Sequence, residues 1–225
     1  MQQGYFITGT DTDIGKTWCS ATLMQYFKGR GQTVVGMKPV ASGCHWVDGQ
    51  LRNQDALILQ EHATNFIPYD LVNPYAFEQP VSPHIASIDN GKNIEIPVIK
   101  ASFDALKDRA DIVIVEAVGG WMAPLNSTED VSDLAVALQL PVILVVGIRL
   151  GCINHAKLTY NAIRSKGLVC AGWIASCVIE DMPAKQLNID TIEENIDAPL
   201  IGELPYSKTP DFSRFAKFID FTISE

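Results

Sequence analysis

The chain has 225 residues, of which 47% are hydrophobic and 19% charged, so it can bury a substantial core, and we expect a single domain over residues 1–225. Its 26 acidic and 17 basic residues give a formal charge of -9. This charge disfavours a nucleic-acid partner, because phosphate contacts need clustered Lys and Arg, and any bound phosphate must be held locally.

Short apolar runs rich in β-branched residues alternate with longer segments of helical pattern. The runs predict buried strands at Tyr5–Thr8, Thr33–Met37, Ile112–Val115, Val142–Val146, Val169–Ala175 and Leu200–Ile201. The longer segments predict helices near Lys16–Lys28, Ile94–Arg109, Val131–Leu138, Ile153–Lys166 and Ala184–Asn195. Strands that alternate with helices pair in parallel through right-handed crossovers. The sequence therefore predicts an α/β fold, a doubly wound and mostly parallel sheet with helices on both faces.

The segment Asn65–Ser87 interrupts this alternation. Its four prolines prevent a long regular helix, while its aromatic residues offer apolar surface for packing; these residues are Pro68, Pro74, Pro80, Pro83, Tyr69, Tyr75 and Phe77. We expect an ordered excursion over the fold. No internal repeat and no linker rich in Gly or Ser marks a domain boundary.

The start of the chain and its cysteines predict a cytoplasmic protein that does not contact a membrane. MQQGYFITG lacks the features of a secretory signal, and the apolar runs are far shorter than the roughly 20 residues of a spanning helix. The five cysteines and four histidines have no metal-ligand spacing, so we expect reduced thiols. Cys44 beside His45 is an alternative nucleophile and base, although sequence neighbours rarely face each other productively.

The segment Gly9–Thr17, GTDTDIGKT, lies between the first predicted strand and the first predicted helix. Its two terminal glycines let the backbone turn so that N–H groups point at phosphate oxygens, and the helix adds its positive N-terminal end. Lys16 can bridge the β- and γ-phosphates, and the Thr17 hydroxyl is placed to ligate magnesium. The loop is one residue longer than the commonest pattern, and a turn that caps an ordinary helix is the alternative. The strand, GKT and helix together favour a nucleoside triphosphate site of P-loop NTPase type.

A magnesium site of this type needs an acid at a second strand end. Glu116, in DIVIVEA, is the first candidate, and Asp55, at the start of DALILQ, is the second. The alternative for Asp55 is a helix cap. Gly119 and Gly120 follow the Glu116 strand, where a flexible backbone could approach the γ-phosphate.

A series of ordered motifs resembles the dethiobiotin synthetase family. They are GTDTDIGKT, MKPVASG at Met37–Gly43, LRNQDA at Leu51–Ala56, NPYAFEQPVSPH at Asn73–His84, VEAVGGW at Val115–Trp121, PVILVVGIRLGCINHA at Pro141–Ala156 and AGW at Ala171–Trp173. The longer loop is also that family's form. The resemblance implies a homodimeric ligase that joins CO2 to 7,8-diaminononanoate, using ATP or another nucleoside triphosphate and Mg²⁺. It implies a carbamate, then a carbamic-phosphoric anhydride, then ring closure with release of phosphate.

The same resemblance implies roles for individual residues. Catalysis is assigned to Lys16, at the γ-phosphate, and Lys38, at the carbamate. The implied magnesium ligands are Thr17, Asp55 and Glu116. The implied nucleotide contacts are Thr12, Asp13, Ile14, Gly15, Lys16, Thr17, Trp18, Asp55, Glu116, Ala117, Val118 and Gly119. Taken alone, Lys38 at a strand end would be a solvated surface charge.

The resemblance also implies a substrate site and a base site. Ser42 resembles a substrate hydrogen-bond donor, although a turn serine is the alternative. Gly151 and Asn154 resemble residues that receive the substrate carboxylate across the dimer interface, and a helix cap is the alternative for Asn154. The base contacts would come from Ser176, Cys177, Leu204, Pro205 and Tyr206, where Tyr206 could instead belong to the core.

The base site departs from the family pattern. An Asn-Asp pair is common there, whereas this chain has Ser176 and Cys177. A serine hydroxyl cannot make the bidentate contact that an asparagine amide makes with adenine. We therefore expect weaker discrimination among triphosphates, with CTP or GTP as alternatives to ATP.

Two other functions use the same phosphate loop. A partitioning-type ATPase usually has a second lysine near the start of the loop, where this chain has Thr10, Asp11 and Thr12. A small-molecule kinase would use the same magnesium and phosphate contacts without any need for bicarbonate.

Overall fold

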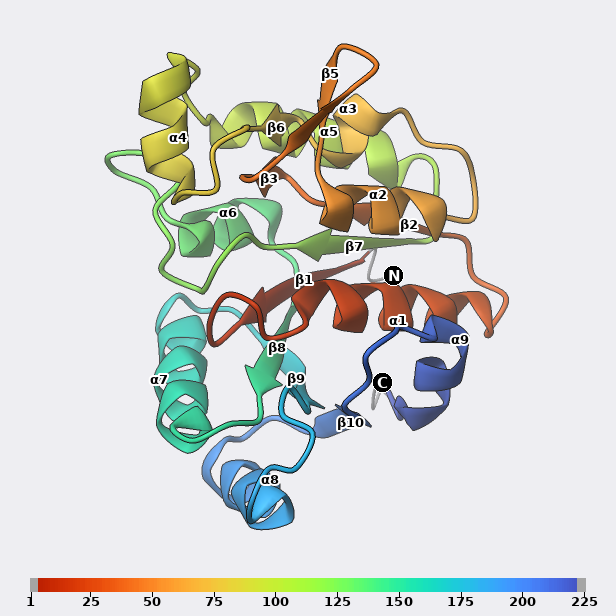
Figure 1. The fold of residues 1–225 in the computed structure, drawn as a ribbon, viewed down its shortest axis with the longest axis vertical. Coiled ribbons are helices and arrows are strands. Elements are labelled where there is room, and N and C mark those ends of the chain that lie inside the picture. Colours follow the sequence, from red (N-terminus) through yellow and green to blue (C-terminus); the bar gives the residue numbers. More distant parts are fainter. Residues whose placement is uncertain (1–3, 222–225) are drawn as a thin grey trace.

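The computed structural model describes residues 4–221, so the outermost ends of the expected domain, residues 1–3 and 222–225, lie outside the described residues. Its centre is a six-stranded sheet in the order β10-β9-β8-β1-β7-β2 (Figure 1). The strands are β1 (Gly4–Gly9), β2 (Val34–Met37), β7 (Ile112–Glu116), β8 (Val142–Gly147), β9 (Cys170–Ser176) and β10 (Leu200–Leu204). All neighbouring pairs are parallel, which confirms the expected fold.

Helices cover both faces of the sheet, because successive side chains of a buried strand point to opposite sides and both sides are apolar here. Phe6 packs into one core cluster and Ile7 into the other. The first cluster lies under α5 (Ile96–Lys107), α6 (Val131–Leu138), α7 (Cys152–Ser165) and α8 (Lys185–Asn195). The second lies under α1 (Lys16–Lys28) and α9 (Phe212–Phe215), which the 3₁₀ turn η1 (Ala216–Phe218) follows. The expected helices are confirmed with small shifts at their ends.

The region between β2 and α5 forms a layer of short elements beyond the β2 edge, at the top of Figure 1. It contains β3 (Val40–Ala41), β4 (His45–Val47), β5 (Gln50–Arg52), α2 (Gln54–Glu61), α3 (Tyr69–Val72), β6 (Tyr75–Ala76) and α4 (Pro83–Asn90). β3 pairs in parallel with β6, and β4 forms an antiparallel hairpin with β5. Strands this short show no readable alternation, so the sequence did not predict them. The excursion is ordered as expected, and Pro83 begins α4, where its missing N–H is not needed.

The parallel strands bring their carboxyl ends to one edge of the sheet, where ligand sites of α/β folds lie. The loop Gly9–Thr17 follows β1, Lys38 follows β2, and Glu116 ends β7. Because β7 lies between β1 and β2, Glu116 comes between the phosphate loop and Lys38. None of the helices within residues 4–221 is long and apolar enough to cross a membrane.

Candidate active site

The phosphate loop has the backbone shape that its glycines predict. Gly15 takes a left-handed conformation with φ 85° and begins α1 without any side-chain cap, so the first N–H groups of the helix stay open to a ligand. A Cβ on Gly9 would come within 2.6 Å of the Ile14 side chain. Asp13 also has a positive φ of 55°. The loop therefore depends on glycine at both ends and holds a strained residue between them.

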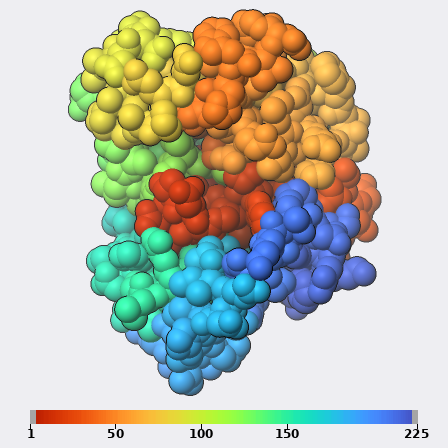
Figure 2. Space-filling model, viewed as in Figure 1, coloured from red at the N-terminus to blue at the C-terminus, as the bar shows by residue number. Residues whose placement is uncertain are grey.

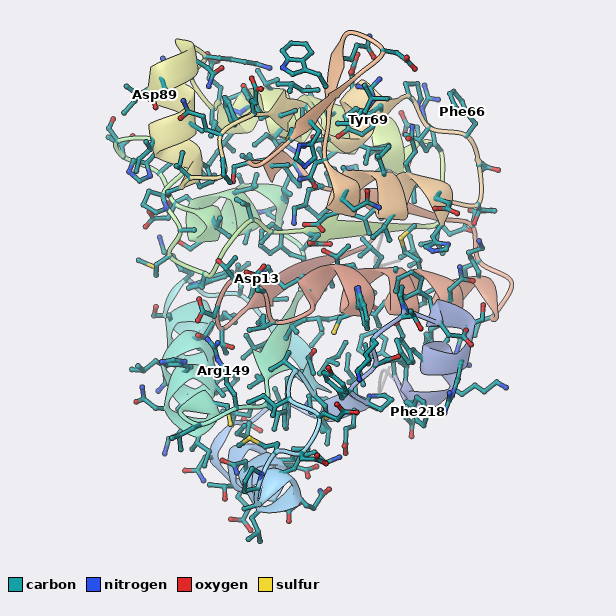
Figure 3. The ribbon with its side chains drawn as sticks, viewed as in Figure 1. Asp13, Phe66, Tyr69, Asp89, Arg149 and Phe218 are labelled. Atoms are coloured by element: carbon teal, nitrogen blue, oxygen red, sulfur yellow. The ribbon has the colours of Figure 1, made fainter. Side chains whose placement is uncertain are left out.

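Asp11 holds this loop in place through both its side chain and its backbone carbonyl. Its carboxylate accepts a hydrogen bond from the Thr12 N–H at 2.8 Å and pairs with the guanidinium of Arg149, at the start of the β8–α7 connection. Its carbonyl oxygen accepts from Lys16 Nζ at 2.6 Å. Figure 3 places Arg149 close below the loop that carries Asp13. The sequence did not predict a role for Arg149, since this pair joins residues 138 positions apart along the chain.

Lys38 lies between the two expected acids. Its Nζ is 2.9 Å from Asp55 Oδ2 and 2.6 Å from Glu116 Oε1, and Thr17 Oγ1 donates to the same Glu116 oxygen at 2.8 Å. Lys38 is 4% exposed and Glu116 0% exposed. The interpretation of Lys38 as a solvated surface charge is therefore wrong, because tertiary packing buries this strand end.

The two lysines of the site have opposite electrostatic surroundings. Burial, with repulsion from Lys38, lowers the pKa of Lys16 to about 8, and the attraction of nearby carboxylates only partly offsets this effect. Burial alone would lower the pKa of Lys38, but the charges of Glu116 and Asp55 outweigh it and raise that pKa above its usual value. Burial would raise the pKa of Asp55, and Lys38 lowers it instead. Lys38 is therefore held in its charged form.

These groups share one cavity of about 870 Å³. Figure 2 shows the red phosphate-loop segment reaching the surface in the middle of this face, between the yellow and orange segments above and the teal and blue segments below. Of the expected site residues, the cavity brings together Thr12, Asp13, Gly15, Lys16, Thr17, Trp18, Lys38, Ser42, Asp55, Glu116, Val118 and Gly119. Lining residues that the sequence did not predict include Ala41, Asn53, Ile58, Pro80, Val81, Ser82, Pro83 and Ala123. Ile14 and Ala117 are buried.

Two alternatives from the sequence are wrong. Asp55 does not cap α2, since Asn53 Oδ1 accepts from the N–H groups of Asp55 at 3.0 Å and Ala56 at 3.2 Å, which leaves the Asp55 carboxylate for Lys38. The pair Cys44 and His45 has no nucleophile geometry. The Cys44 thiol donates to Ala41 O at 3.6 Å, burial raises its pKa, and His45 is exposed on β4.

The expected base contacts lie outside the 870 Å³ cavity, at the carboxyl ends of β9 and β10. They adjoin the loop directly, because Ser176 Oγ is only 2.7 Å from the position a Cβ on Gly15 would take. The Cys177 N–H donates to Leu204 O at 3.0 Å, and its thiol contacts Glu203 Oε1 at 3.7 Å. Tyr206 is 37% exposed, so its assignment to the core is wrong.

Gly151 and Asn154 line a second, more open hollow of about 580 Å³ over α7, separate from the first. The N-cap of α7 is Gly151, with φ 94° and no side-chain cap. Asn154 therefore does not cap the helix, and its side chain lies exposed in the first turn. The structure does not bring these residues into the first cavity.

The chain is similar to known proteins over most of its length. A family model described as an AAA domain matches residues 3–212. The ATP-dependent dethiobiotin synthetase BioD of Xylella fastidiosa (strain Temecula1) is 48% identical over 202 residues, covering 90% of this chain and 89% of the relative. BioD 1 of Escherichia coli (strain K12) is 44% identical over 224 residues, covering 99% of this chain and 100% of the relative.

Solved structures of lower identity support the fold alone. The MinC:MinD cell division protein complex of Aquifex aeolicus matches with a TM-score of 0.58 at 18% identity, covering 94% of this chain and 85% of that chain. A ParA family ATPase from Chlorobium tepidum matches with a TM-score of 0.55 at 13% identity, covering 92% and 86%. Likeness at this identity shows a shared fold alone, because one fold serves many functions. The sequence identity to the two dethiobiotin synthetases identifies the family: the chain belongs to the dethiobiotin synthetase family.

Proposed function

We propose that this protein is an ATP-dependent dethiobiotin synthetase, which joins CO2 to 7,8-diaminononanoate and closes the ureido ring of dethiobiotin with release of ADP and phosphate. The observation that carries the proposal is the juxtaposition of two buried lysines in one cavity. Lys16 lies on the phosphate loop, and Lys38 lies between Asp55 and Glu116. One cation is thus placed for the phosphates and one for a second anion that reacts with them.

The reaction proceeds through two activated forms of CO2. One substrate amine adds to CO2 and loses a proton, which gives a carbamate. A carbamate oxygen then attacks the γ-phosphorus, so that the bond to ADP breaks and a mixed anhydride forms. The second amine attacks the carbonyl carbon, closes the ring and expels phosphate. No group of the protein forms a bond in these steps, so catalysis depends on positioning and on charge stabilisation.

Each part of the cavity has a proposed role in that sequence. Lys16 and the N–H groups of Asp13–Trp18 hold the phosphates, with the Thr12 side chain at the loop crest. Lys38 binds the carbamate oxygen and stabilises the charge that develops as the anhydride forms. Ser42 lines the same cavity and donates a hydrogen bond to the diamine substrate.

Magnesium fits the oxygen atoms present. Thr17, Asp55 and Glu116 offer hard oxygen ligands in the same cavity, Thr17 Oγ1 lies 2.8 Å from Glu116 Oε1, and Glu116 Oε2 is buried without a hydrogen-bond partner among the described residues. No group of three or more His, Cys, Asp or Glu that could hold a metal occurs within residues 4–221. Magnesium in such sites keeps waters and takes phosphate oxygens beside one or two protein ligands. When bound with the nucleotide, magnesium would neutralise phosphate charge. Thr17, Asp55 and Glu116 are the residues that would hold it.

In the proposed binding mode, the nucleoside extends from the phosphate loop on the side opposite Lys38. The γ-phosphate end faces Lys38 and Glu116, so the base extends past Gly15 toward Ser176, Cys177 and the segment Leu204–Tyr206. Val118 and Gly119 line the cavity beside the loop. These contacts are consistent with a base site that makes few directional hydrogen bonds.

We further propose that the enzyme is a homodimer whose partner supplies the hollow over α7. That hollow contains the open N-terminus of α7 at Gly151, together with Asn154 and Lys157, and so suits a carboxylate. The substrate has a carboxylate at the end remote from its amines. A fully active species that sediments as a monomer at assay concentration would contradict this arrangement.

The test measures phosphate release by purified protein with Mg²⁺ and ATP. 7,8-Diaminononanoate and bicarbonate are added separately and then together, and the mass of the organic product is determined by mass spectrometry. We expect release only when both are present, together with the mass of dethiobiotin. A kinase would release no phosphate on addition of bicarbonate and would instead give a phosphorylated product. If no phosphate is released with ATP, CTP or GTP, the proposed function is overturned.

A further inference from the structure

A continuous chain of buried hydrogen bonds joins the backbone of Lys38 to the backbone of Asp55. Asn73 Nδ2 donates to Lys38 O at 2.7 Å, and Asn73 Oδ1 accepts from Tyr69 OH at 3.0 Å. The same hydroxyl oxygen accepts from the Asn53 N–H at 2.8 Å. Asn53 Oδ1 then caps α2 by accepting from the Asp55 N–H at 3.0 Å. The two ends of the chain are the residues whose side chains form an ion pair in the cavity.

All three linking residues are buried, since Asn53 is 8%, Tyr69 7% and Asn73 3% exposed. Each side chain makes more than one hydrogen bond, so the chain is well satisfied. Asn73 Nδ2 also reaches Tyr75 O at 3.2 Å, which ties the chain to β6. Figure 3 shows Tyr69 in the upper layer of the molecule, where it begins α3. A satisfied network of this kind fixes the relative positions of the elements it joins.

Lys38 needs such support because it lies beyond the hydrogen-bonded ladder of the sheet. β2 ends at Met37, and Pro39, which follows Lys38, has no N–H to donate. Both backbone groups of Lys38 are instead held by the excursion: its N–H donates to Val72 O at 2.8 Å, and its carbonyl accepts from Asn73. The segment Tyr69–Asn73 therefore holds the backbone of a residue in the cavity that it does not itself line.

We propose that Tyr69 and Asn73 are positioning residues of the reaction, which set Lys38 against Asp55 without touching the substrate. This role gives the proline-rich excursion a function in catalysis. The inference rests on the proposed function for its effect on turnover. Its structural content, the placement of the Lys38 ammonium, is independent of which reaction the site performs.

The test compares Tyr69→Phe with Tyr75→Phe. Both changes remove one buried hydroxyl from the excursion and keep the ring; Tyr75 OH accepts from the Glu95 N–H at 3.1 Å and has no link through its side chain to Lys38. For Tyr69→Phe we expect kcat to fall on the order of tenfold to hundredfold, the loss produced by a small misplacement of a catalytic group, with KM for ATP within about twofold of the parent. Tyr75→Phe should leave kcat within about twofold.

A second readout does not depend on activity. In protein labelled with ¹⁵N-lysine, the Lys38 ammonium should give a slowly exchanging NMR signal, assigned by its loss in Lys38→Met, because it is buried between carboxylates. Tyr69→Phe should shift or broaden this signal, and Tyr75→Phe should leave it unchanged. If the parent makes no dethiobiotin, the proposed function fails while the NMR comparison still decides the positioning role.

Asn73→Ser is the second variant, because it breaks the link to Lys38 and leaves the bond between Tyr69 and Asn53. It should reproduce the loss in kcat and the shifted signal. Equal effects of Tyr69→Phe and Tyr75→Phe on kcat and on the Lys38 signal, or no effect of Tyr69→Phe on either, would overturn the inference.

Discussion

Two lysines of the same cavity, equally hidden from water, have opposite surroundings. Lys16 is 6% exposed and its ammonium donates to the carbonyl of Asp11, whereas Lys38 is 4% exposed and its ammonium lies between two carboxylates. Burial lowers the pKa of the first, and the carboxylates raise the pKa of the second. Burial alone therefore does not define a role for a lysine. Lys16 carries a charge that the protein leaves for an anion to neutralise, while Lys38 is already neutralised by the fold.

Replacement of Lys38 by Met should have the largest effect on the protein as a whole. It leaves the fully buried Glu116 carboxylate without its cation, so we expect a loss of about 3–5 kcal/mol in the free energy of unfolding, together with loss of dethiobiotin formation. Urea unfolding and the phosphate-release assay measure the two effects. Stability equal to that of the parent would show that Glu116 does not depend on Lys38.

Replacement of Lys16 by Met should separate activity from stability. Because the ammonium is buried beside a like charge, its removal should leave the free energy of unfolding within about 1 kcal/mol of the parent or raise it. Turnover should fall on the order of a hundredfold to a thousandfold, since the γ-phosphate loses its cation. A destabilisation as large as that of Lys38→Met would remove the distinction between the two lysines.

Replacement of Gly15 by Ala tests whether the left-handed conformation of Gly15 is required where the phosphate loop adjoins the proposed base site. The left-handed φ of 85° strains any side chain, and the new Cβ would come within 2.7 Å of Ser176 Oγ. We expect a loss of about 1–2 kcal/mol in stability from the strain, and a further weakening of ATP binding. Gly91→Ala is the matched control, because Gly91 has a φ of 61° with no atom within 4 Å of its Cβ position. Identical losses in both variants would mean that the Ser176 contact adds nothing.

Replacement of Ser176 by Asn should have the smallest effect, confined to the choice of base. One added hydrogen bond to adenine contributes about 0.5–1.5 kcal/mol, so the ratio of kcat/KM for ATP over CTP should rise by up to about tenfold. Competition between the two triphosphates in one reaction measures the ratio directly. The control, Ser176→Ala, should change it less. A parent enzyme that already prefers ATP strongly would contradict the expected weak discrimination.

The phosphate loop could be read from the sequence because its geometry is local. The glycines, the helix N-terminus and Lys16 act within one turn of backbone, so their order along the chain fixes their arrangement in space. The resemblance to a family named Lys38, and the need for an acid to hold magnesium had already named Glu116 and Asp55. Neither indicated that Lys38 is buried, that Asn53 rather than Asp55 caps α2, or that Arg149 pairs with Asp11.

The sequence by itself determined the α/β fold, the phosphate loop and the family, because alternating apolar segments and a contiguous motif depend on neighbouring residues. Only the tertiary structure decided the charge state of the site and the hydrogen bonds that hold the backbone of Lys38. The strand order places β7 between β1 and β2, and this order brings Glu116 to Lys38 and to Thr17 across sequence separations of 78 and 99 residues. Contacts over such distances depend on packing of the whole sheet, which fixes both the low dielectric around Lys38 and the carboxylates that neutralise it.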